Sequence, residues 1–289
     1  MFRLPIPGTP NLARALTTTS QNPRSEDPEN PPEIGGSGIY LTVLIPAFNE
    51  DQRIGPTLER IRDYLSAQSY SWHVTVVSDG STDKTNQIAT DFAAKDGRFS
   101  LLAYSPNRGK GHAVRIGMLS ADSTLILFSD ADLAAPIEEI EKLLPAIQNG
   151  AEIAIGSRPL KDSKLEVRQP LYRELLGRGF NLAVQTLAIR GIADTQCGFK
   201  LFQRNAAREV FSRCKLDGFG FDFESLMIAR DLGLAIAEVP IRWAHQEGSK
   251  VVLMRDGPRM LGDLVQLRMM GKSKRLARNP ETSAPEQTG

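Results

Sequence analysis

The 289-residue sequence contains few cysteines, no long apolar run and no excess of one charge. Its two cysteines, Cys197 and Cys214, have the spacing of neither a zinc site nor a disulfide framework. No run of about 18 apolar residues is present to span a membrane, and the N-terminus lacks the apolar core of a secretory signal. With 35 Lys and Arg against 34 Asp and Glu, a nucleic-acid partner is not expected. These absences favour a protein of the reducing cytoplasm.

Two glycine-rich nucleotide-binding motifs are also missing. A dinucleotide-binding enzyme carries Gly-x-Gly-x-x-Gly directly after its first strand, but that position reads Pro46-Ala-Phe-Asn-Glu50. No Gly-x-x-x-x-Gly-Lys-[Ser/Thr] sequence occurs either, which argues against a P-loop NTPase. Both enzyme classes are therefore disfavoured.

Composition divides the chain into three parts. Residues 1–38 are rich in proline, serine and threonine and have no apolar period, which is typical of a disordered tail. Residues 39–253 alternate apolar runs with amphipathic segments, and we expect one α/β domain there. Residues 254–289 combine an amphipathic stretch with basic residues, and we expect a C-terminal segment followed by a tail.

Five apolar runs predict buried strands, at residues 40–45, 73–77, 100–104, 124–128 and 152–155. Amphipathic helices are expected between them, at residues 54–65, from 82 onward, 109–119 and 137–147, with Ser81 or Thr82 capping the second. Apolar strands separated by helices indicate a mostly parallel sheet covered on both faces. Such sheets bind ligands beyond the carboxyl ends of their strands.

Polar clusters follow all five predicted strands, where such a sheet binds its ligands. In chain order they are Asn49-Glu50, Ser78-Asp-Gly-Ser-Thr-Asp83, Asn107-Arg-Gly-Lys-Gly111, Ser129-Asp-Ala-Asp132 and Gly156-Ser-Arg158. Any one of them is an ordinary turn or loop sequence. Their succession at consecutive strand ends favours a binding site over chance.

The residue types in these clusters suit a nucleoside-diphosphate donor. Asp130 and Asp132 supply adjacent hard oxygen ligands for Mg²⁺ or Mn²⁺, and water and phosphate oxygens can complete the coordination. Asp79 can accept a hydrogen bond from the imide N–H of a nucleobase. Arg108 and Lys110 stand in a glycine-rich loop and can neutralise phosphate. We therefore expect a diphosphate donor and a divalent metal at this edge of the sheet.

These clusters resemble the motifs of the family 2 inverting glycosyltransferases, which have the GT-A fold. Later segments, Gly191–Phe202 and Glu247–Lys250, resemble the dolichyl-phosphate β-glucosyltransferases within that family. The resemblance extends over residues 39–270, and Asp194-Thr-Gln-Cys-Gly-Phe-Lys200 is its most specific part. One departure is Ser78, which stands where the family has a first acidic residue.

Enzymes of that family transfer glucose from UDP-glucose to a polyprenyl (dolichyl) phosphate and form a β-linked product. The resemblance implies that the donor is held by Pro46, Ala47, Glu50, Asp79 and Lys110. It implies that Asp130 and Asp132 bind the metal and the donor, and that Asp194 and Gln196 border the transferred sugar. The acceptor phosphate would be bound by Arg158, Arg173 and Lys250.

Inversion requires in-line attack on the anomeric carbon, with a metal stabilising the charge on the departing UDP. Asp132, Asp194 and Arg158 are therefore the expected catalytic residues. A lipid phosphate is already an anion, so a cation such as Arg158 matters more than a strong base. Asp194 remains open as a base, as a sugar-orienting group or as the residue that pins its turn.

Several reactive residue types have simpler explanations. Asp222 and Glu224 open a predicted helix, where acidic residues favour the helix dipole and cap. Cys197 is expected to be a packed residue rather than a nucleophile. His112 and His245 have no partner at metal-ligand spacing, so structural roles are expected for both.

Together with the family resemblance, two amphipathic stretches make peripheral binding to the cytoplasmic face of a membrane the favoured hypothesis. The first is residues 171–189. The second is residues 256–271, with one predicted stripe of Met260, Leu261, Leu264, Val265 and Leu267, followed by a basic run of Arg268, Lys272, Lys274, Arg275 and Arg278.

Three alternatives stay open. A polyprenyl-phosphate mannose synthase would use GDP-mannose, although the pair Gln196-Cys197 favours glucose. A family 2 transferase could use a soluble acceptor. A non-catalytic nucleotide-sugar binder is disfavoured by the retention of both Asp130 and Asp132. The sequence does not indicate an oligomeric state.

Overall fold

A computed structural model describes residues 38–167, 184, 189, 191–246 and 253–282. The predicted tail, apart from Gly38, and the predicted phosphate ligands Arg173 and Lys250 lie outside the described residues. The same holds for nearly all of the first amphipathic stretch, residues 171–189.

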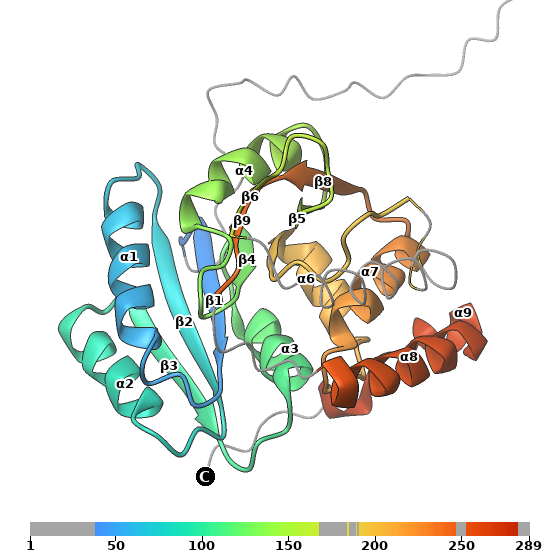
Figure 1. The fold of residues 1–289 in the computed structure, drawn as a ribbon, viewed down its shortest axis with the longest axis horizontal. Helices are drawn as coiled ribbons and strands as arrows, with labels where there is room; N and C mark the ends of the chain where they lie inside the picture. The colour runs from blue at the N-terminus through green and yellow to red at the C-terminus, as the bar shows by residue number, and fades with distance from the viewer. Residues whose placement is uncertain (1–37, 168–183, 185–188, 190, 247–252, 283–289) are drawn as a thin grey trace, which may run out of the picture. The chain divides into compact units, whose positions relative to one another are not determined.

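The described part of the chain is built on a seven-stranded sheet with the order β3-β2-β1-β4-β7-β5-β8 (Figure 1). The strands are β1 (Leu41–Ala47), β2 (Trp72–Asp79), β3 (Phe99–Tyr104), β4 (Leu125–Ser129), β5 (Ile153–Ser157), β7 (Phe199–Gln203) and β8 (Ile236–Pro240). β7 runs antiparallel to β4 and β5, and the other neighbours are parallel. The predicted mostly parallel sheet is confirmed, and the ends of its five predicted strands shift by at most two residues.

A smaller sheet pairs β6 (Lys164–Val167) with β9 (Arg242–Ala244) in parallel. β9 is also tied to the loop after β4, because the Ala244 N–H donates to the Ala134 carbonyl at 2.9 Å. This bond places β9 next to the loop that carries Asp130 and Asp132.

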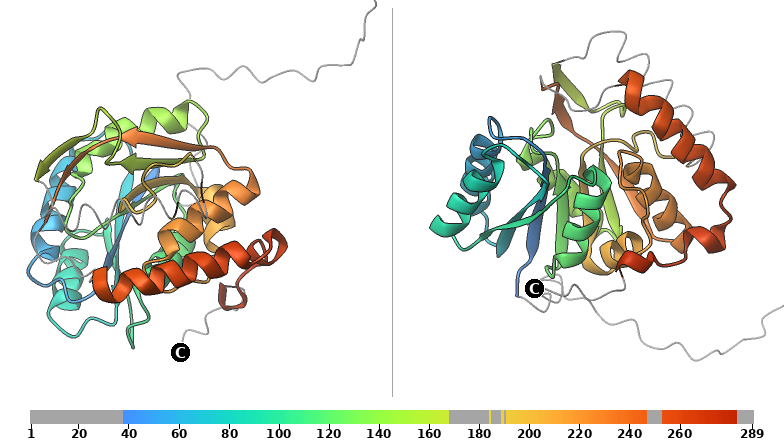
Figure 2. Two further views of the ribbon diagram at one scale, coloured as in Figure 1. Left: turned by 45° about the vertical axis from the view of Figure 1, so that its right-hand side comes forward. Right: turned by 90° about the horizontal axis from the view of Figure 1, so that it is seen from below.

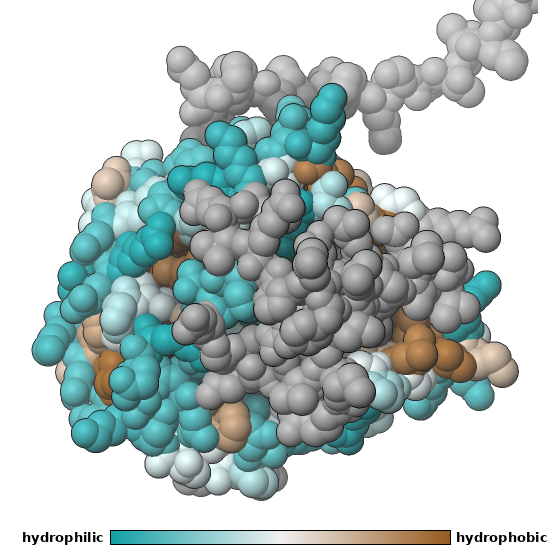
Figure 3. All heavy atoms as spheres, viewed as in Figure 1, coloured by the Kyte–Doolittle hydropathy of each residue, from teal (hydrophilic) through white to brown (hydrophobic). Residues whose placement is uncertain are grey.

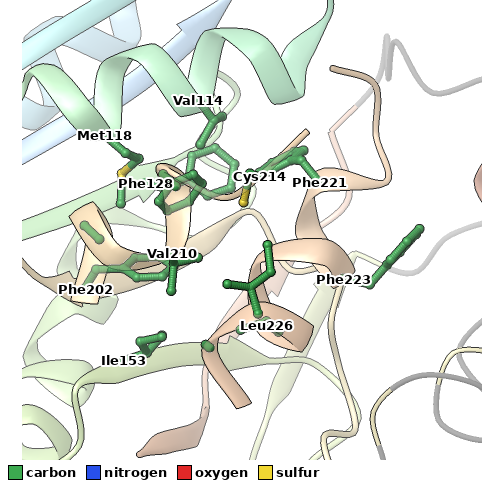
Figure 4. Close-up of a cluster of buried hydrophobic side chains, with 14 of the residues drawn as sticks. Val114, Met118, Phe128, Ile153, Phe202, Val210, Cys214, Phe221, Phe223 and Leu226 are labelled. Atoms are coloured by element: carbon green, nitrogen blue, oxygen red, sulfur yellow. The ribbon is translucent and has the colours of Figure 1, made fainter. Parts of the chain in front are cut away.

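Helices cover both faces of the large sheet, as the sequence predicts (Figure 2). One face packs against α1 (Ile54–Ser66), α2 (Thr85–Lys95), η1 (Ile137–Glu139) and α4 (Ile140–Gln148). The other packs against α3 (Lys110–Ser120), α6 (Arg204–Phe211) and α7 (Phe221–Leu232). Successive side chains of a strand point to opposite faces of the sheet. In β1, Val43 and Ile45 therefore pack in the core under α1 and α4, whereas Leu44 packs in the core under α3 and α7. Figure 4 shows the second core, where Phe128 of β4 meets Phe221 of α7.

The predicted cap of α2 is wrong. The helix begins at Thr85, and the Asp83 carboxylate accepts its N–H at 2.9 Å. Ser81 and Thr82 instead bind the neighbouring loop: the Ser81 hydroxyl accepts the Asn49 N–H, and the Thr82 N–H donates to the Asn49 side chain. Because they hold together the loops after β1 and β2, they are not available as caps.

The apolar residues of α8 (Leu253–Met269) form two stripes rather than one. Met260, Leu264 and Leu267 are buried in the core on the α7 side of the sheet. Leu261, Val265 and Met269 are exposed, with Met269 at 82%. Figure 3 shows apolar side chains gathered over α8 at the right of the view. Within the described residues, no helix has the length and apolar content needed to cross a membrane.

The basic residues after α8 are divided in the same way. Arg275 of α9 (Lys272–Arg275) is mostly buried, pairs with Asp231 at 2.7 Å and donates to the carbonyls of Leu267 and Met270. Lys272 and Lys274 are exposed. The chain then reaches η2 (Pro280–Thr282), where Glu281 pairs with Arg108 at 2.9 Å. The predicted basic run therefore includes one arginine that serves the fold.

Candidate active site

Asp130 and Asp132 lie in a loop that begins where β4 ends and that is held from two sides. The Asp130 N–H donates to the Gly198 carbonyl at 3.1 Å, which ties the loop to the start of β7. On the other side, the Thr57 hydroxyl of α1 donates to the Ala131 carbonyl at 2.6 Å. The Asp132 carboxylate accepts the Ala134 N–H at 3.0 Å. The two aspartates are thus fixed next to each other, and both are partly exposed.

Lys110, the first residue of α3, lies against this pair, with Nζ 2.6 Å from Asp130 Oδ1. Burial disfavours the charged ammonium, but the carboxylates of Asp130 and Asp222 outweigh that effect, so the pKa of Lys110 is raised. Burial and the neighbouring Asp130 both raise the pKa of Asp132. The loops after β3 and β4 therefore form one charged cluster, as the strand-end rule predicts.

A second, buried ion pair lies behind this cluster. Lys200 of β7 pairs with Asp222 of α7 and donates to the Cys197 carbonyl at 2.6 Å. The ammonium groups of Lys200 and Lys110 lie 5.6 and 5.3 Å from the centre of the Phe128 ring. Burial raises the pKa of Asp222, and the two lysines counteract this rise. Asp222 therefore has a lysine partner rather than the helix-capping role predicted from the sequence.

The donor set of Asp130 and Asp132 fits a divalent cation whose coordination is completed by a ligand. Within the described ranges, no cluster of three or more acidic, histidine or cysteine side chains suited to a metal is found. Mg²⁺ commonly binds one or two carboxylates together with substrate phosphates and water. Two adjacent carboxylates at an open loop meet that requirement, whereas a site made only of protein groups would need more ligands.

The Asp79 carboxylate is fully occupied by donors from the end of β3 and from the loop that precedes α3. Its Oδ1 accepts hydrogen bonds from the Tyr104 hydroxyl and the Arg108 N–H, at 2.8 and 2.7 Å. Its Oδ2 accepts from the Asn107 amide and the Gly109 N–H, both at 2.8 Å. A carboxylate offers about four acceptor positions. The expected bond to a nucleobase therefore has no free acceptor in this arrangement, and Asp79 instead positions the loop that leads to Lys110.

The glycines around Lys110 allow backbones to approach closely. A Cβ at Gly111 would lie 2.7 Å from the Gly218 carbonyl, and Gly109 has a φ of 114°. The N–H groups of Gly111 and His112 donate to the Asp217 carbonyl, so they face the chain rather than a ligand. Only the Lys110 side chain of this turn faces Asp130.

The other predicted donor residues lie where β1 ends. Pro46 and Ala47 are buried in the last part of the strand. Glu50 is bound on two sides: its N–H donates to the Thr85 hydroxyl, and its side chain accepts from Arg53 at 2.7 Å. These residues therefore lie at the same sheet edge as Asp79.

Arg158 and Asp194 form a two-pronged ion pair between the end of β5 and the turn before β7. The Nε and Nη2 of Arg158 donate to Asp194 at 2.6 and 2.8 Å, and the Gln196 N–H donates to the same carboxylate. Asp194 is fully buried, which disfavours its charge, but Arg158 outweighs the burial and lowers the pKa of Asp194. Its charge is therefore committed to Arg158, which favours the turn-pinning role over that of a base.

Cys197, next along this turn, is 1% exposed, and burial raises the pKa of its thiol to about 12. A thiol in this state is not a nucleophile at neutral pH. The packed role predicted from the sequence agrees with this position. His112 lies 2.8 Å from Arg115 and packs edge-on to Tyr104, in agreement with its predicted structural role.

A pocket opens beside Asp130, in the space between the loop after β4 and the turn before β7. Its lining residues are Ser129, Asp130, Leu133, Ala134, Ala135, Cys197, Gly198 and Trp243. Sequence analysis missed Trp243 and Lys200. Trp243 follows β8, a strand that was not predicted, so the strand-end rule would have found it had β8 been recognised.

Comparison with known proteins identifies the family of the chain. The model of glycosyl transferase family 2 matches residues 42–211. A dolichyl-phosphate β-glucosyltransferase of Trichomonas vaginalis is 38% identical over 259 residues, which cover 86% of this chain and 76% of that protein. The protein of that name from Drosophila melanogaster is 39% identical over 226 residues, 74% of this chain and 69% of its own.

Solved structures share the fold. Glucosyl-3-phosphoglycerate synthase from Mycobacterium tuberculosis, in complex with Mn²⁺, UDP-glucose and phosphoglyceric acid, has a TM-score of 0.59 at 20% identity, over 84% of this chain and 82% of that chain. Mannosyl-3-phosphoglycerate synthase from Rubrobacter xylanophilus has a TM-score of 0.61 at 22% identity, over 86% and 80%. These structures show the fold, and the family match and the curated relatives confirm the resemblance found in the sequence. The chain belongs to glycosyl transferase family 2 and, within it, to the dolichyl-phosphate β-glucosyltransferases.

Proposed function

We propose that this protein transfers glucose from UDP-glucose to a polyprenyl phosphate of the dolichyl type, with inversion at the anomeric carbon. The observation that carries the proposal is the paired carboxylates of Asp130 and Asp132 beside Lys110, in a chain 38% identical to a dolichyl-phosphate β-glucosyltransferase. The names of the curated relatives favour glucose over mannose and a lipid phosphate over a soluble acceptor.

Asp130 and Asp132 would hold a divalent cation, Mg²⁺ or Mn²⁺, which when bound stabilises negative charge on the departing diphosphate. Lys110 adds a second positive charge at the same place, and its raised pKa keeps it protonated at neutral pH. Pro46, Ala47 and Glu50, together with the loop held by Asp79, would hold the uridine.

The acceptor side needs an anion-binding group more than a base, because a phosphate monoester is already ionised near neutral pH. The Arg158 side chain is 26% exposed, and its Nε and Nη2 donate hydrogen bonds to Asp194. Its remaining nitrogen, Nη1, is the candidate donor to the acceptor phosphate. The predicted partners Arg173 and Lys250 lie outside the described residues and stay predictions.

Transfer of radiolabelled sugar tests the reaction. With polyprenyl phosphate and Mn²⁺, label from UDP-glucose should enter a product that organic solvent extracts, whereas label from GDP-mannose or UDP-galactose should not. Asp132→Ala should abolish transfer, and the matched control Asp63→Ala, at an exposed site on α1, should leave it unchanged. Label that stays in the aqueous phase while UDP is released would refute the lipid acceptor.

The protein would meet its lipid through α8, at the cytoplasmic face of a membrane. The exposed Leu261, Val265 and Met269 can enter the lipid interface, and Lys272 and Lys274 lie close behind them in the chain for anionic headgroups. A variant with serine at the three apolar positions should lose most of its flotation with anionic liposomes. Equal flotation of the variant and the wild type would refute this surface.

A further inference from the structure

The last described segment of the chain, residues 279–282, is bound to the loop between α6 and α7. The Asn279 N–H donates to the Ser212 carbonyl at 2.8 Å, and the Asn279 side chain donates to the Cys214 carbonyl at 2.9 Å. Asn279 is only 6% exposed, so this anchor is buried. The Asn279 side chain also accepts the Glu281 N–H at 3.2 Å. The anchor therefore fixes where Glu281 lies.

Glu281 pairs with two arginines, one in the loop before α3 and one in α3 itself. Its Oε2 lies 2.9 Å from Arg108 Nη2 and 3.4 Å from Arg115 Nη2. Both arginines also pair with Asp217 of the loop between α6 and α7, at 3.6 and 2.7 Å. The Arg115 side chain is 2% exposed, and its Nη1 has no hydrogen-bond partner among the described residues. Because a buried guanidinium needs carboxylates close by, Glu281 and Asp217 together compensate the charge of the two arginines.

Asp217, the second carboxylate partner of these arginines, also holds the turn that carries Lys110. Its backbone carbonyl accepts the N–H of Gly111, the next residue after Lys110, at 2.7 Å. The Lys110 ammonium in turn lies 2.6 Å from the Asp130 carboxylate. A continuous series of contacts therefore links Glu281 to Lys110, through the two arginines, Asp217 and the backbone of Gly111.

We propose that Glu281 is a positioning residue of the donor site, which holds the loop carrying Lys110 in place for a nucleoside diphosphate. Glu281 acts on this loop from 173 residues further along the chain than Arg108. Because Arg108 Nη2 faces Glu281 and Asp217, Arg108 has a supporting role here in place of the expected contact with phosphate. A loop that is ordered before its ligand arrives binds that ligand at a smaller entropic cost. This inference rests on the proposed function and adds a residue to its donor site.

Calorimetric titration with UDP and Mn²⁺ tests the sign of this effect. Glu281→Ala should weaken UDP binding by about fivefold, which corresponds to about 1 kcal/mol, the upper range for an exposed ion pair. Tighter binding would show instead that Glu281 withholds Arg108 from the diphosphate, and either tighter or unchanged binding would overturn the inference. Glu281→Gln, which keeps an acceptor oxygen for Arg108, should recover part of the loss. The matched control is Glu138→Ala, which removes an exposed pair with Arg60 between α1 and η1 and should leave UDP binding unchanged.

Two further measurements separate positioning of the loop from a general loss of stability. In Glu281→Ala, the Gly111 amide should exchange its hydrogen about fivefold faster, while the midpoint of thermal unfolding should fall by no more than about 2 °C. KM for UDP-glucose should rise by a similar factor, and KM for polyprenyl phosphate should not change. Wild-type exchange at Gly111 in this variant would refute the inference and leave the proposed function intact. Failure of the wild type to bind UDP in the presence of Mn²⁺ would refute the proposed function itself.

Discussion

Replacing Gly198 by alanine should disable the candidate metal site without a change in any acidic residue. A Cβ at this position would lie 2.7 Å from Oδ1 of Asp130 and closer still to Cγ and Oδ2, all below the 3.0 Å that real Cβ contacts respect. The carboxylate can move away only by giving up its present contact with Lys110 at 2.6 Å, and that movement displaces the candidate metal ligand. A displacement of about 1 Å in a positioned group costs roughly 100-fold in rate, or about 3 kcal/mol.

We therefore expect Gly198→Ala to lower kcat/KM by about 100-fold and to raise the Mn²⁺ concentration needed for half-maximal activity. Gly218→Ala is the matched control, because its Cβ would meet no atom within 4 Å. Binding of UDP without metal and a cooperative thermal transition should persist in both variants. Wild-type activity and metal dependence in Gly198→Ala would show that the Asp130 carboxylate is not fixed as described.

Three further changes test the surroundings of the site. Asp222→Ala leaves Lys200 as a buried charge without its carboxylate partner, so urea unfolding should show a free energy of unfolding lower by about 3–5 kcal/mol. A decrease of less than about 1 kcal/mol would contradict the buried ion pair. Burial raises the pKa of Glu224 to about 7 from its ordinary 4.5, so the folded protein keeps a proton that the unfolded chain has released. Relative to Glu224→Gln, the wild type should therefore lose up to about 3 kcal/mol of stability as pH rises from 4.5 to above 7, and a constant difference across that range would refute the shift. Asp79→Asn replaces an acceptor with a donor facing the Gly109 N–H, so it should lower the free energy of unfolding by about 1–3 kcal/mol and weaken UDP binding. Unchanged UDP affinity would show that the loop positioned by Asp79 does not bind the nucleotide.

The first half of the fold could be predicted because its strands and helices carry clear apolar periods. The second half could not. β7 is short, contains Lys200 within its apolar run and runs against its neighbours. The lysine looks unsuited to a buried strand until Asp222, from a distant helix, is placed beside it. Strand direction and pairing of this kind depend on tertiary contacts, which a local pattern does not contain.

The strand-end rule brought the right loops together, but it did not assign partners within them. Asp130, Asp132 and Lys110 do lie at one edge of the sheet. Asp79 belongs to the same edge, yet its carboxylate accepts hydrogen bonds from four donors, one at the end of β3 and three in the loop before α3. Which acceptor a donor selects depends on loop geometry at the scale of a single hydrogen bond, and residue type alone does not fix it. The roles predicted for the site residues therefore remain predictions that the variants above address.

The insertion of β7 between β4 and β5 affects when the site can exist during synthesis. A nascent chain that has emerged only as far as β5 contains Asp130 and Asp132 but lacks Gly198, whose carbonyl accepts a hydrogen bond from the Asp130 N–H. It also lacks the strand that joins β4 to β5. On the ribosome, the two aspartates therefore remain without their final support until the second half of the chain folds back into the middle of the sheet.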